Sequence, residues 1–284
     1  MKNNKKILII CLISMILIGL VIFIAISKEN KVNAQDKVKN SEKIISSGTY
    51  QIKFSDLVSL DDLKEYNNKE VTAIGYLSPI TSYDGSFGYL MNLPYQTCPY
   101  CIPSDTKITN TISIFAKSGQ KIEFTEAAVL VRGTLKLEPY TDAYGYSYNY
   151  RLVDVKIEKA DTSELGEKIA LYNKLAEKEI LTNLMAMLYA VDDNVFYDEY
   201  TANGATYERQ LVDTSKIDTI LTNLEDFKEQ DISILKEVAE ELKNIATDTN
   251  ELIQKENYEK ILEYKERTLN LFYRIGDWMR LYQL

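Results

Sequence analysis

The chain has 284 residues, 45% of them hydrophobic and 26% charged, which is enough for a membrane segment and two folded domains. Its formal net charge is −9, and an acidic protein repels phosphate backbones, so we expect no nucleic-acid partner. The sequence contains no histidine, which excludes a Ser-His-Asp triad, a Cys-His dyad and a histidine-based zinc protease site.

A run of mostly apolar residues occupies positions 7–26, after a short N-terminal tail that carries lysines. A helix of about twenty residues spans the hydrocarbon core of a bilayer, roughly 30 Å. We therefore predict a single-pass anchor in the cell membrane over residues 1–27 and a polar tether at 28–47, with the rest of the chain extracytoplasmic. A signal peptide cleaved after Ala34 is the alternative.

Residues 48–160 contain short apolar and aromatic segments bounded by turn-forming residues, a pattern typical of β-strands. The spacing of leucines between Leu57 and Tyr66 predicts a short helix before the first strand. The five predicted strands are residues 71–77, 87–93, 112–116, 127–137 and 146–157. Gly133 lies inside the fourth strand and indicates a bulge or bend. Five strands in this length favour a small OB-like β-barrel, with a β-sandwich as the second choice.

The order of short motifs in this region is G-Y-L-x-P, F-x-Y-L-M, C-P-Y-C-x-P, V-x-G-T-L and Y-R-L. This order resembles an uncharacterised group of bacterial extracytoplasmic proteins with an OB-fold-like domain, in which a C-x-x-C-x-P loop follows the second strand. The resemblance covers about residues 70–157. It implies the fold and the extracytoplasmic location and, by analogy, a role near transporters or in metal handling.

Cys98 and Cys101 form a C-x-x-C pair that admits three interpretations. A structural loop comes first, and an oxidising compartment would favour a disulfide there. A closed zinc site needs four ligands, so Asp84, Asp105 or a second copy of the chain would have to complete it. Redox catalysis is suggested by a similarity to the glutaredoxin dithiol, but Pro103 and strand-like sequence follow where that motif requires a helix.

Tyrosines occupy every second position near the end of the β region, at Tyr144, Tyr146, Tyr148 and Tyr150. In one strand these side chains would project from the same face. That face is a candidate ligand-binding surface, for a glycan or a peptide rather than a nucleic acid, given the acidic charge. The alternative is that the rings pack across strands or beneath the helical domain.

Residues 161–284 are acidic and show helical periodicity, which predicts a bundle of three antiparallel helices. The first begins at a capping box of Asp161 and Glu164. The second starts near residue 214 and contains a possible break at Asp231. A box of Asp248 and Glu251 is expected to open the last helix.

Asn203-Gly204 lies between the first two predicted helices. Asn-Gly is a strong signal for a tight turn, so we predict a β-hairpin or an ordered loop at 193–213. The acidic residues of this region lack the spacing of a calcium loop and are interpreted as a solvated face.

The fold class predicted is therefore multi-domain α+β: an anchor, an OB-like β domain at 48–160 and a helical bundle at 161–284. We predict a non-enzymatic binding module of the bacterial cell envelope, whose partner is an envelope protein, a cell-wall component or a transporter. We expect no catalytic residue, metal ligand or cofactor. The alternatives are thiol–disulfide exchange through Cys98 and Cys101, and metal binding or delivery.

Overall fold

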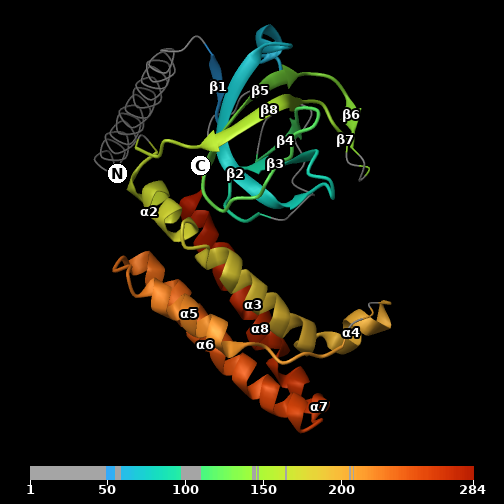
Figure 1. Ribbon diagram of the computed structural model, residues 1–284, viewed down its shortest axis with the longest axis vertical. Helices are drawn as coiled ribbons and strands as arrows, with labels where there is room; N and C mark the ends of the chain where they lie inside the picture. Colours follow the sequence, from blue (N-terminus) through green and yellow to red (C-terminus); the bar gives the residue numbers. More distant parts are fainter. Residues whose placement is uncertain are drawn as a thin grey trace, which may run out of the picture. The chain divides into compact units, whose positions relative to one another are not determined.

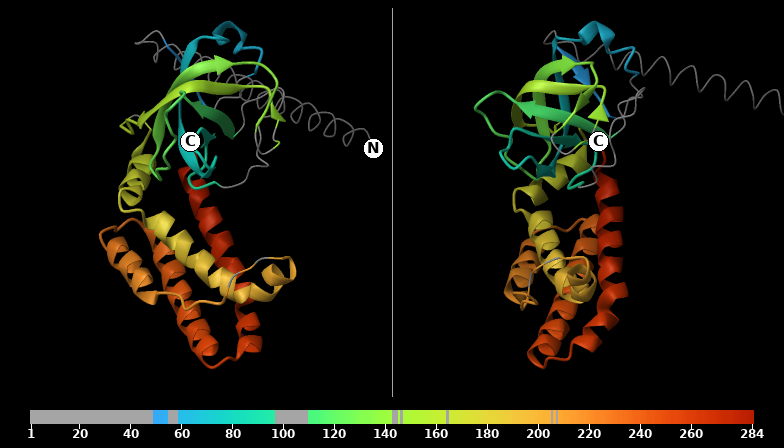
Figure 2. Two further views of the ribbon diagram at one scale, coloured as in Figure 1. Left: turned by 45° about the vertical axis from the view of Figure 1, so that its right-hand side comes forward. Right: turned by 90° about the vertical axis from the view of Figure 1, so that its right-hand side faces the viewer.

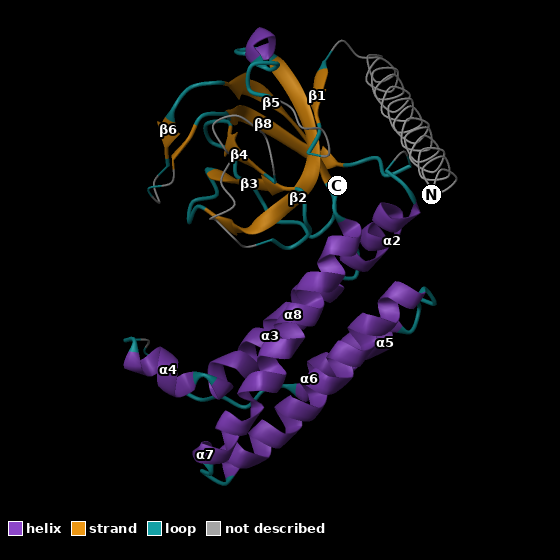
Figure 3. Ribbon diagram, turned by 180° about the vertical axis from the view of Figure 1, so that it is seen from behind, coloured by secondary structure: helices purple, strands orange, loops and turns teal. Residues whose placement is uncertain are grey.

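The computed structural model describes residues 49–54, 59–96, 110–142, 145, 147–163, 165–204, 206 and 208–284. Within this part of the chain, no helix has the length and apolar character needed to cross a membrane. The predicted anchor and tether lie outside the described residues. Residues Ile52–Leu284 form one compact unit, in which strands come first and helices follow, the order of an α+β protein (Figures 1 and 3).

The strands fall into a six-stranded mixed sheet and a separate two-stranded sheet. Their bounds are β1 Tyr50–Ile52, β2 Glu70–Thr81, β3 Phe87–Met91, β4 Thr111–Ala116, β5 Val129–Lys136, β6 Tyr140–Thr141, β7 Ser147–Tyr148 and β8 Arg151–Lys159. The predicted helix before β2 appears as a short 3-10 helix at Lys64–Tyr66, and part of its predicted length lies outside the described residues.

Five of these strands form a near-ring. β2 pairs antiparallel with both β3 and β5, β3 pairs antiparallel with β4, and β8 joins β4 in parallel and β5 antiparallel. The ring therefore runs β2-β3-β4-β8-β5 and returns to β2, and its strands curve around a common interior (Figure 2). All five predicted strands are present as ring members.

The start of the last predicted strand is wrong. Ser147 and Tyr148 belong to β7, which pairs with β6 in the two-stranded sheet, and β8 begins only at Arg151. The tyrosine run is therefore not one strand. Tyr150 lies between the two strands, fully buried, where its hydroxyl donates to the carbonyl of Thr111 at 3.1 Å.

The interior of the ring is filled by aliphatic side chains. β5 alternates buried and partly exposed residues along its whole length, which is the period of a strand with one face on the core. Each fully buried Val, Leu or Ile contributes about 1.5–3 kcal/mol relative to an exposed one. The fully buried members include Val71, Ala73, Leu90, Ile112, Ile114, Val131, Leu135 and Leu152.

The predicted irregularity at Gly133 is confirmed. The register of β5 against β8 shifts between Arg132 and Thr134, and the extra residue lies on β8, where Asp154 has a φ of 54°. A Cβ atom at Gly133 would stand 2.8 Å from the side chain of Val155 and 3.1 Å from the carbonyl oxygen of Val153. Glycine is therefore required on one strand so that the bulge can form on the other.

The helices are α2 Glu167–Ala176, α3 Ile180–Val195, α4 Tyr197–Ala202, α5 Thr214–Leu224, α6 Gln230–Gln254, α7 Tyr258–Ile261 and α8 Lys265–Met279. The first predicted helix is interrupted: α2 and α3 are separated by Glu179, which has a φ of 50°. Asp161 accepts from the amide of Ser163, but the helix starts only at Glu167, after Gly166. The break near Asp231 is confirmed, with Glu229 in the capping position.

The predicted helix start at Asp248 is wrong. Asp248 and Glu251 lie inside α6 rather than at a new helix start, because buried residues continue along the same face through Ile245, Ala246 and Thr249. The segment 193–213, predicted as a β-hairpin or an ordered loop, contains α4 and no strand among its described residues. Asn203-Gly204 ends that helix, with Gly204 at a φ of 91°, a common C-terminal helix signal.

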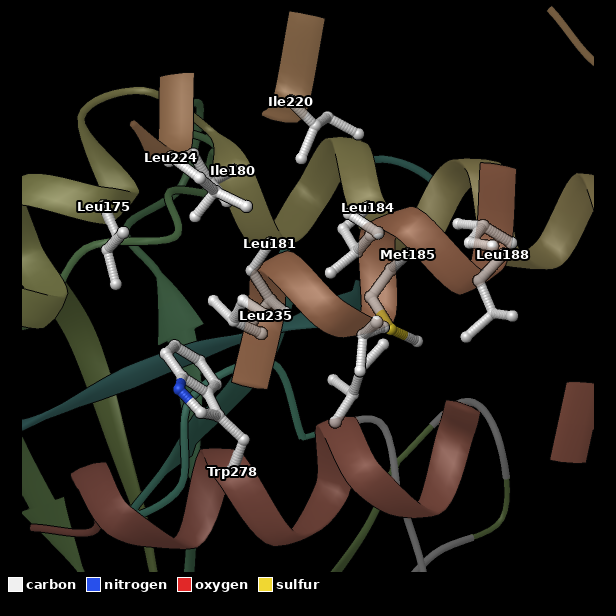
Figure 4. Packing of buried hydrophobic residues seen from close by; sticks show 14 of the residues in the cluster. Leu175, Ile180, Leu181, Leu184, Met185, Leu188, Ile220, Leu224, Leu235 and Trp278 are labelled. Atoms are coloured by element: carbon white, nitrogen blue, oxygen red, sulfur yellow. The ribbon is translucent and has the colours of Figure 1, made fainter. Parts of the chain in front are cut away.

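α3 is the central helix of the helical region. It packs against α5, α6 and α8, and its leucines meet Ile220 and Leu224 of α5, Leu235 of α6 and Trp278 of α8 (Figure 4). The same core contains Tyr76 and Ala128 of the β domain. The apolar core of the helical region thus extends to these two residues of the β domain.

The bulge residue gives a test of the fold. Asp154 is exposed and held at positive φ, a conformation that costs a residue other than glycine about 1–2 kcal/mol. We expect Asp154→Gly to raise the free energy of unfolding by up to about 1 kcal/mol, and Asp154→Val to lower it by at least that amount. Urea denaturation of the two variants measures both changes.

Lys156, which is also exposed on β8, is the matched control. Lys156→Gly should lower the free energy of unfolding by roughly 0.5–1 kcal/mol, because glycine weakens an ordinary strand position. An equal loss at Asp154 and Lys156 would show that no bulge forms at Asp154.

Candidate functional site

The structure separates the predicted site residues into two groups. Cys98, Cys101, Tyr144 and Tyr146 lie outside the described residues, so their predicted roles stay predictions. Tyr148 and Tyr150 are described and buried, at 3% and 0% exposure. In the described ranges, no group of three or more Cys, Asp or Glu side chains is arranged to hold a metal ion.

Tyr148 belongs to a buried polar cluster outside the interior of the ring. Its hydroxyl donates to a carboxylate oxygen of Asp142 at 3.1 Å, and the hydroxyl of Tyr89 on β3 donates to the same oxygen at 2.8 Å. Burial raises the pKa of Tyr148 well above its ordinary value, so its phenol acts as a neutral donor. Asp142 thereby holds the β6–β7 hairpin against β3.

Aromatic rings extend this cluster in a continuous column. Phe87 stacks on Phe115 with ring centroids 5.4 Å apart, Phe115 meets Tyr140 edge-on at 5.2 Å, and Tyr140 stacks on Tyr148 at 5.7 Å. Such pairs contribute about 0.5–1.5 kcal/mol each beyond their buried area. Two of the four rings come from the β6–β7 hairpin, so this hairpin is fixed by packing as well as by Asp142.

Arg151 lies over this column. Its guanidinium carbon is 4.1 Å from the centroid of the Tyr140 ring and 5.9 Å from that of Phe115. One terminal nitrogen donates to Glu138 at 2.8 Å, while the other is buried and makes no hydrogen bond to the described residues. A groove of about 330 Å³ runs along the hairpin beside Tyr140 and Tyr148.

The loop between β2 and β3 carries an exposed aromatic side chain. Tyr83 is fully exposed, although the loop that carries it is held by many bonds. Ser82 exchanges backbone and side-chain hydrogen bonds with Phe87, and the amide of Ser86 donates to Asp84 at 2.9 Å. Gly85 is bonded on both sides, its amide to Ser82 and its carbonyl to Ile122.

The junction between the β domain and the helices is made first by aromatic residues. The hydroxyl of Tyr76 on β2 donates to the carbonyl of Tyr282 at 2.9 Å, and the Tyr76 ring meets that of Tyr172 on α2 edge-on at 5.1 Å. Trp278 packs against Tyr172 and Tyr282 and donates its ring N–H to the carbonyl of Asp231 at 2.9 Å.

A second set of contacts comes from the segment before β5. The carboxylate of Glu126, 5% exposed, accepts from the amides of Leu181 and Thr182 at 3.2 and 2.9 Å and from the hydroxyl of Thr182 at 2.8 Å. Burial raises the pKa of Glu126 to about 7, against the opposing effect of these hydrogen bonds. Two residues on, the amide of Ala128 donates to the side-chain oxygen of Asn173 at 3.0 Å.

Neither Glu126 nor Tyr83 was among the residues singled out from the sequence. Glu126 lies in E-F-T-E-A-A and is bonded to residues 55 and 56 positions away, a separation that no local pattern reveals. Tyr83 lies in S-Y-D-G-S, where the turn residues indicate a loop tip. An aromatic residue at such a loop tip is the sequence signal that could have identified Tyr83.

Comparison with known proteins gives a limited result. No family model matches the chain, and no curated protein is similar to it in sequence. Among solved structures, a DUF3299 family protein from Pseudomonas aeruginosa aligns with 40% of this chain and 98% of its own length, at 14% identity and a TM-score of 0.25. At that similarity we draw no functional argument from it.

The junction yields a prediction about stability. Asn173→Ala removes the acceptor of a buried amide, which should lower the free energy of unfolding by about 1–3 kcal/mol. Asn183→Ala is the control, because Asn183 is exposed on α3 and its side chain bonds only locally, to the carbonyl of Glu179 four residues earlier; we expect a change within about 0.5 kcal/mol. Denaturant titrations of both variants decide the matter, and equal effects would contradict a specific role for Asn173.

Proposed function

We propose that the chain is a membrane-anchored, extracytoplasmic binding module of the bacterial cell envelope rather than an enzyme, and that its β domain is of the OB type. The strand order supports the OB assignment. The ring β2-β3-β4-β8-β5, closed by β2–β5 and with a parallel β4–β8 pair, has the connectivity of a five-stranded Greek-key barrel. In that fold, ligands bind at the second and third strands and at two flanking loops.

The observation that carries the proposal is the exposed Tyr83 on a loop that is otherwise held by hydrogen bonds. It lies between the first two strands of the ring, which is one of those two ligand-binding loops. Tyrosine is enriched among the residues that dominate protein interfaces. A loop already fixed in the free protein loses little conformational entropy on binding. The affinity for a partner is therefore not reduced by the cost of ordering the loop.

The second flanking loop corresponds to the segment that contains the β6–β7 hairpin. Asp142 and the aromatic column fix β6 and β7 on β3 and β4, and one buried guanidinium nitrogen of Arg151 beside them makes no hydrogen bond to the described residues. A partner that carries carbonyl or carboxylate groups, such as an envelope protein or a cell-wall peptide, could accept from the hydroxyl of the exposed Tyr83. The predicted anchor at 7–26 would keep the module at the membrane. Thiol exchange and metal delivery through Cys98 and Cys101 stay predictions.

The partner is tested by replacing Tyr83 with a photo-crosslinking phenylalanine analogue in cells that produce the full chain. We expect a crosslinked species at this position, identified by mass spectrometry after digestion as either a protein or a cell-wall fragment. Tyr273, 69% exposed on α8, is the control position. Equal yields at positions 83 and 273, or no adduct at 83, would contradict a binding role for the loop.

The location is tested separately. We expect protease added to intact spheroplasts to degrade the β domain and the helical region, and the chain to sediment with membranes unless residues 1–27 are removed. A cytoplasmic protein measured in the same samples must stay intact. Protection of the whole chain until lysis would contradict the extracytoplasmic assignment and leave the Tyr83 test unaffected.

A further inference from the structure

The segment of residues 208–213, which leads into α5, is held through its main chain. Asn194 of α3 accepts from the amide of Gln210 at 3.1 Å and donates to the carbonyl of the same residue at 2.7 Å. Asn250 of α6 makes the same pair of bonds with Val212, both at 2.8 Å. Two helices therefore fix alternate residues of the segment where it crosses them (Figure 1).

These bonds define the conformation of the segment. In an extended chain, the N–H and C=O groups of one residue point to the same edge, and those of its neighbours point to the opposite edge. Because Gln210 and Val212 both direct these groups toward the asparagines, the segment is extended there, and Leu211 directs its own groups to the other edge. Among the described residues, the N–H and C=O of Leu211 have no hydrogen-bond partner.

A groove of about 310 Å³ lies between this segment and α3. Met187 and Ala190 of α3 line one wall, and Leu211 lines the other. The Leu211 side chain is 53% exposed, more than any other leucine or isoleucine in the described ranges. Unpaired main-chain groups beside a groove are what strand addition requires, since the main-chain bonds give affinity and the groove receives alternate side chains of the added strand.

The charge around the groove indicates which kind of peptide it favours. Four charged side chains line it, and three of them are acidic: Asp193, Glu208 and Asp213, against Lys216. Arg209, the other cation of the segment, is paired with Asp198 at 3.0 Å. Opposite charges on a partner favour its approach and fix its register. The groove is therefore complementary to a basic peptide.

We propose that the 208–213 segment is a preformed strand edge that binds an extended segment of a partner protein in which basic and apolar residues alternate. The main chain of the partner pairs with the N–H and C=O of Leu211, its apolar side chains enter the groove beside Met187, and its basic side chains reach the acidic rim. Asn194 and Asn250 already hold the edge in place, so little ordering accompanies binding. This surface is separate from the Tyr83 loop, and the two proposals are tested independently.

The probe is a short capped peptide of alternating lysine and valine, titrated calorimetrically into the full chain in a neutral detergent. We expect this peptide to bind, and its counterpart of alternating glutamate and valine to bind more weakly. Two further analogues carry N-methyl groups on the valine amides or on the lysine amides. Because only every second amide of an added strand faces the edge, one analogue should lose roughly tenfold or more in affinity and the other should lose little.

A substitution in the chain tests the same edge. Leu211→Pro removes the unpaired N–H and leaves the bonded groups of Gln210 and Val212 intact, and the residue before a proline favours the extended conformation that Gln210 already has. We expect a loss in affinity of roughly tenfold or more for the lysine–valine peptide, with little change in the denaturation midpoint. Leu211→Ala is the matched control, because it shortens the same side chain, keeps the N–H and should bind more tightly than Leu211→Pro.

Three results would overturn the proposal: no binding of the lysine–valine peptide, equal affinities of the two N-methylated analogues, or equal affinities of Leu211→Pro and Leu211→Ala. Sedimentation distinguishes the other occupant. A dimer of the unmutated chain that Leu211→Pro abolishes would show that a second copy occupies the edge, which would also overturn the assignment to a partner protein. If the proline variant fails to fold, the two N-methylated peptides decide the question in the unmutated chain.

Discussion

The packing of α3 is the constraint on which the rest of this structure depends. One face of α3 meets α5, α6 and α8 along its whole length, and its first turn depends on Glu126 from the β domain for acceptors. A helix used in this way cannot shift without disturbing both halves of the molecule. This explains why the backbone tolerates a left-handed residue at Glu179. The bend there lets α2 contact Tyr76 while the start of α3 donates to Glu126.

The inside and the outside of the β domain are stabilised by different kinds of interaction. Inside the ring, stability comes from aliphatic burial, which does not depend on the titration of any side chain. Outside it, the β6–β7 hairpin is held by Asp142, two phenols and a cation–π contact from Arg151. Polar and aromatic contacts of this kind fix orientation more than they add stability. β6, β7 and the Tyr83 loop are therefore fixed in position by such contacts, while the interior of the ring contributes aliphatic burial.

The five ring strands could be predicted from the sequence because alternation and turn residues are local signals, and the bulge could be predicted because Gly133 interrupts a long strand. Helix boundaries were harder to predict from the sequence. Asp248 begins a capping pattern, yet the buried face of α6 continues through Thr249, so tertiary packing overrides the local signal. The tyrosine run appeared to be one strand because alternation does not reveal that Tyr148 pairs with Tyr140. Glu126 was inaccessible in principle, since its role depends on residues more than fifty positions away.

Closure of the ring has a consequence for how any partner can bind. β2 is paired on both sides, by β3 and β5, and β8 is paired on both sides, by β4 and β5. Neither strand therefore presents an edge that is unpaired along its whole length, which disfavours the addition of a peptide strand. Recognition of a partner by the ring would then rely on side chains and loops rather than on extended backbone. Of the strands outside the ring, β6 and β7 contribute only two residues each, too short an edge for stable strand addition.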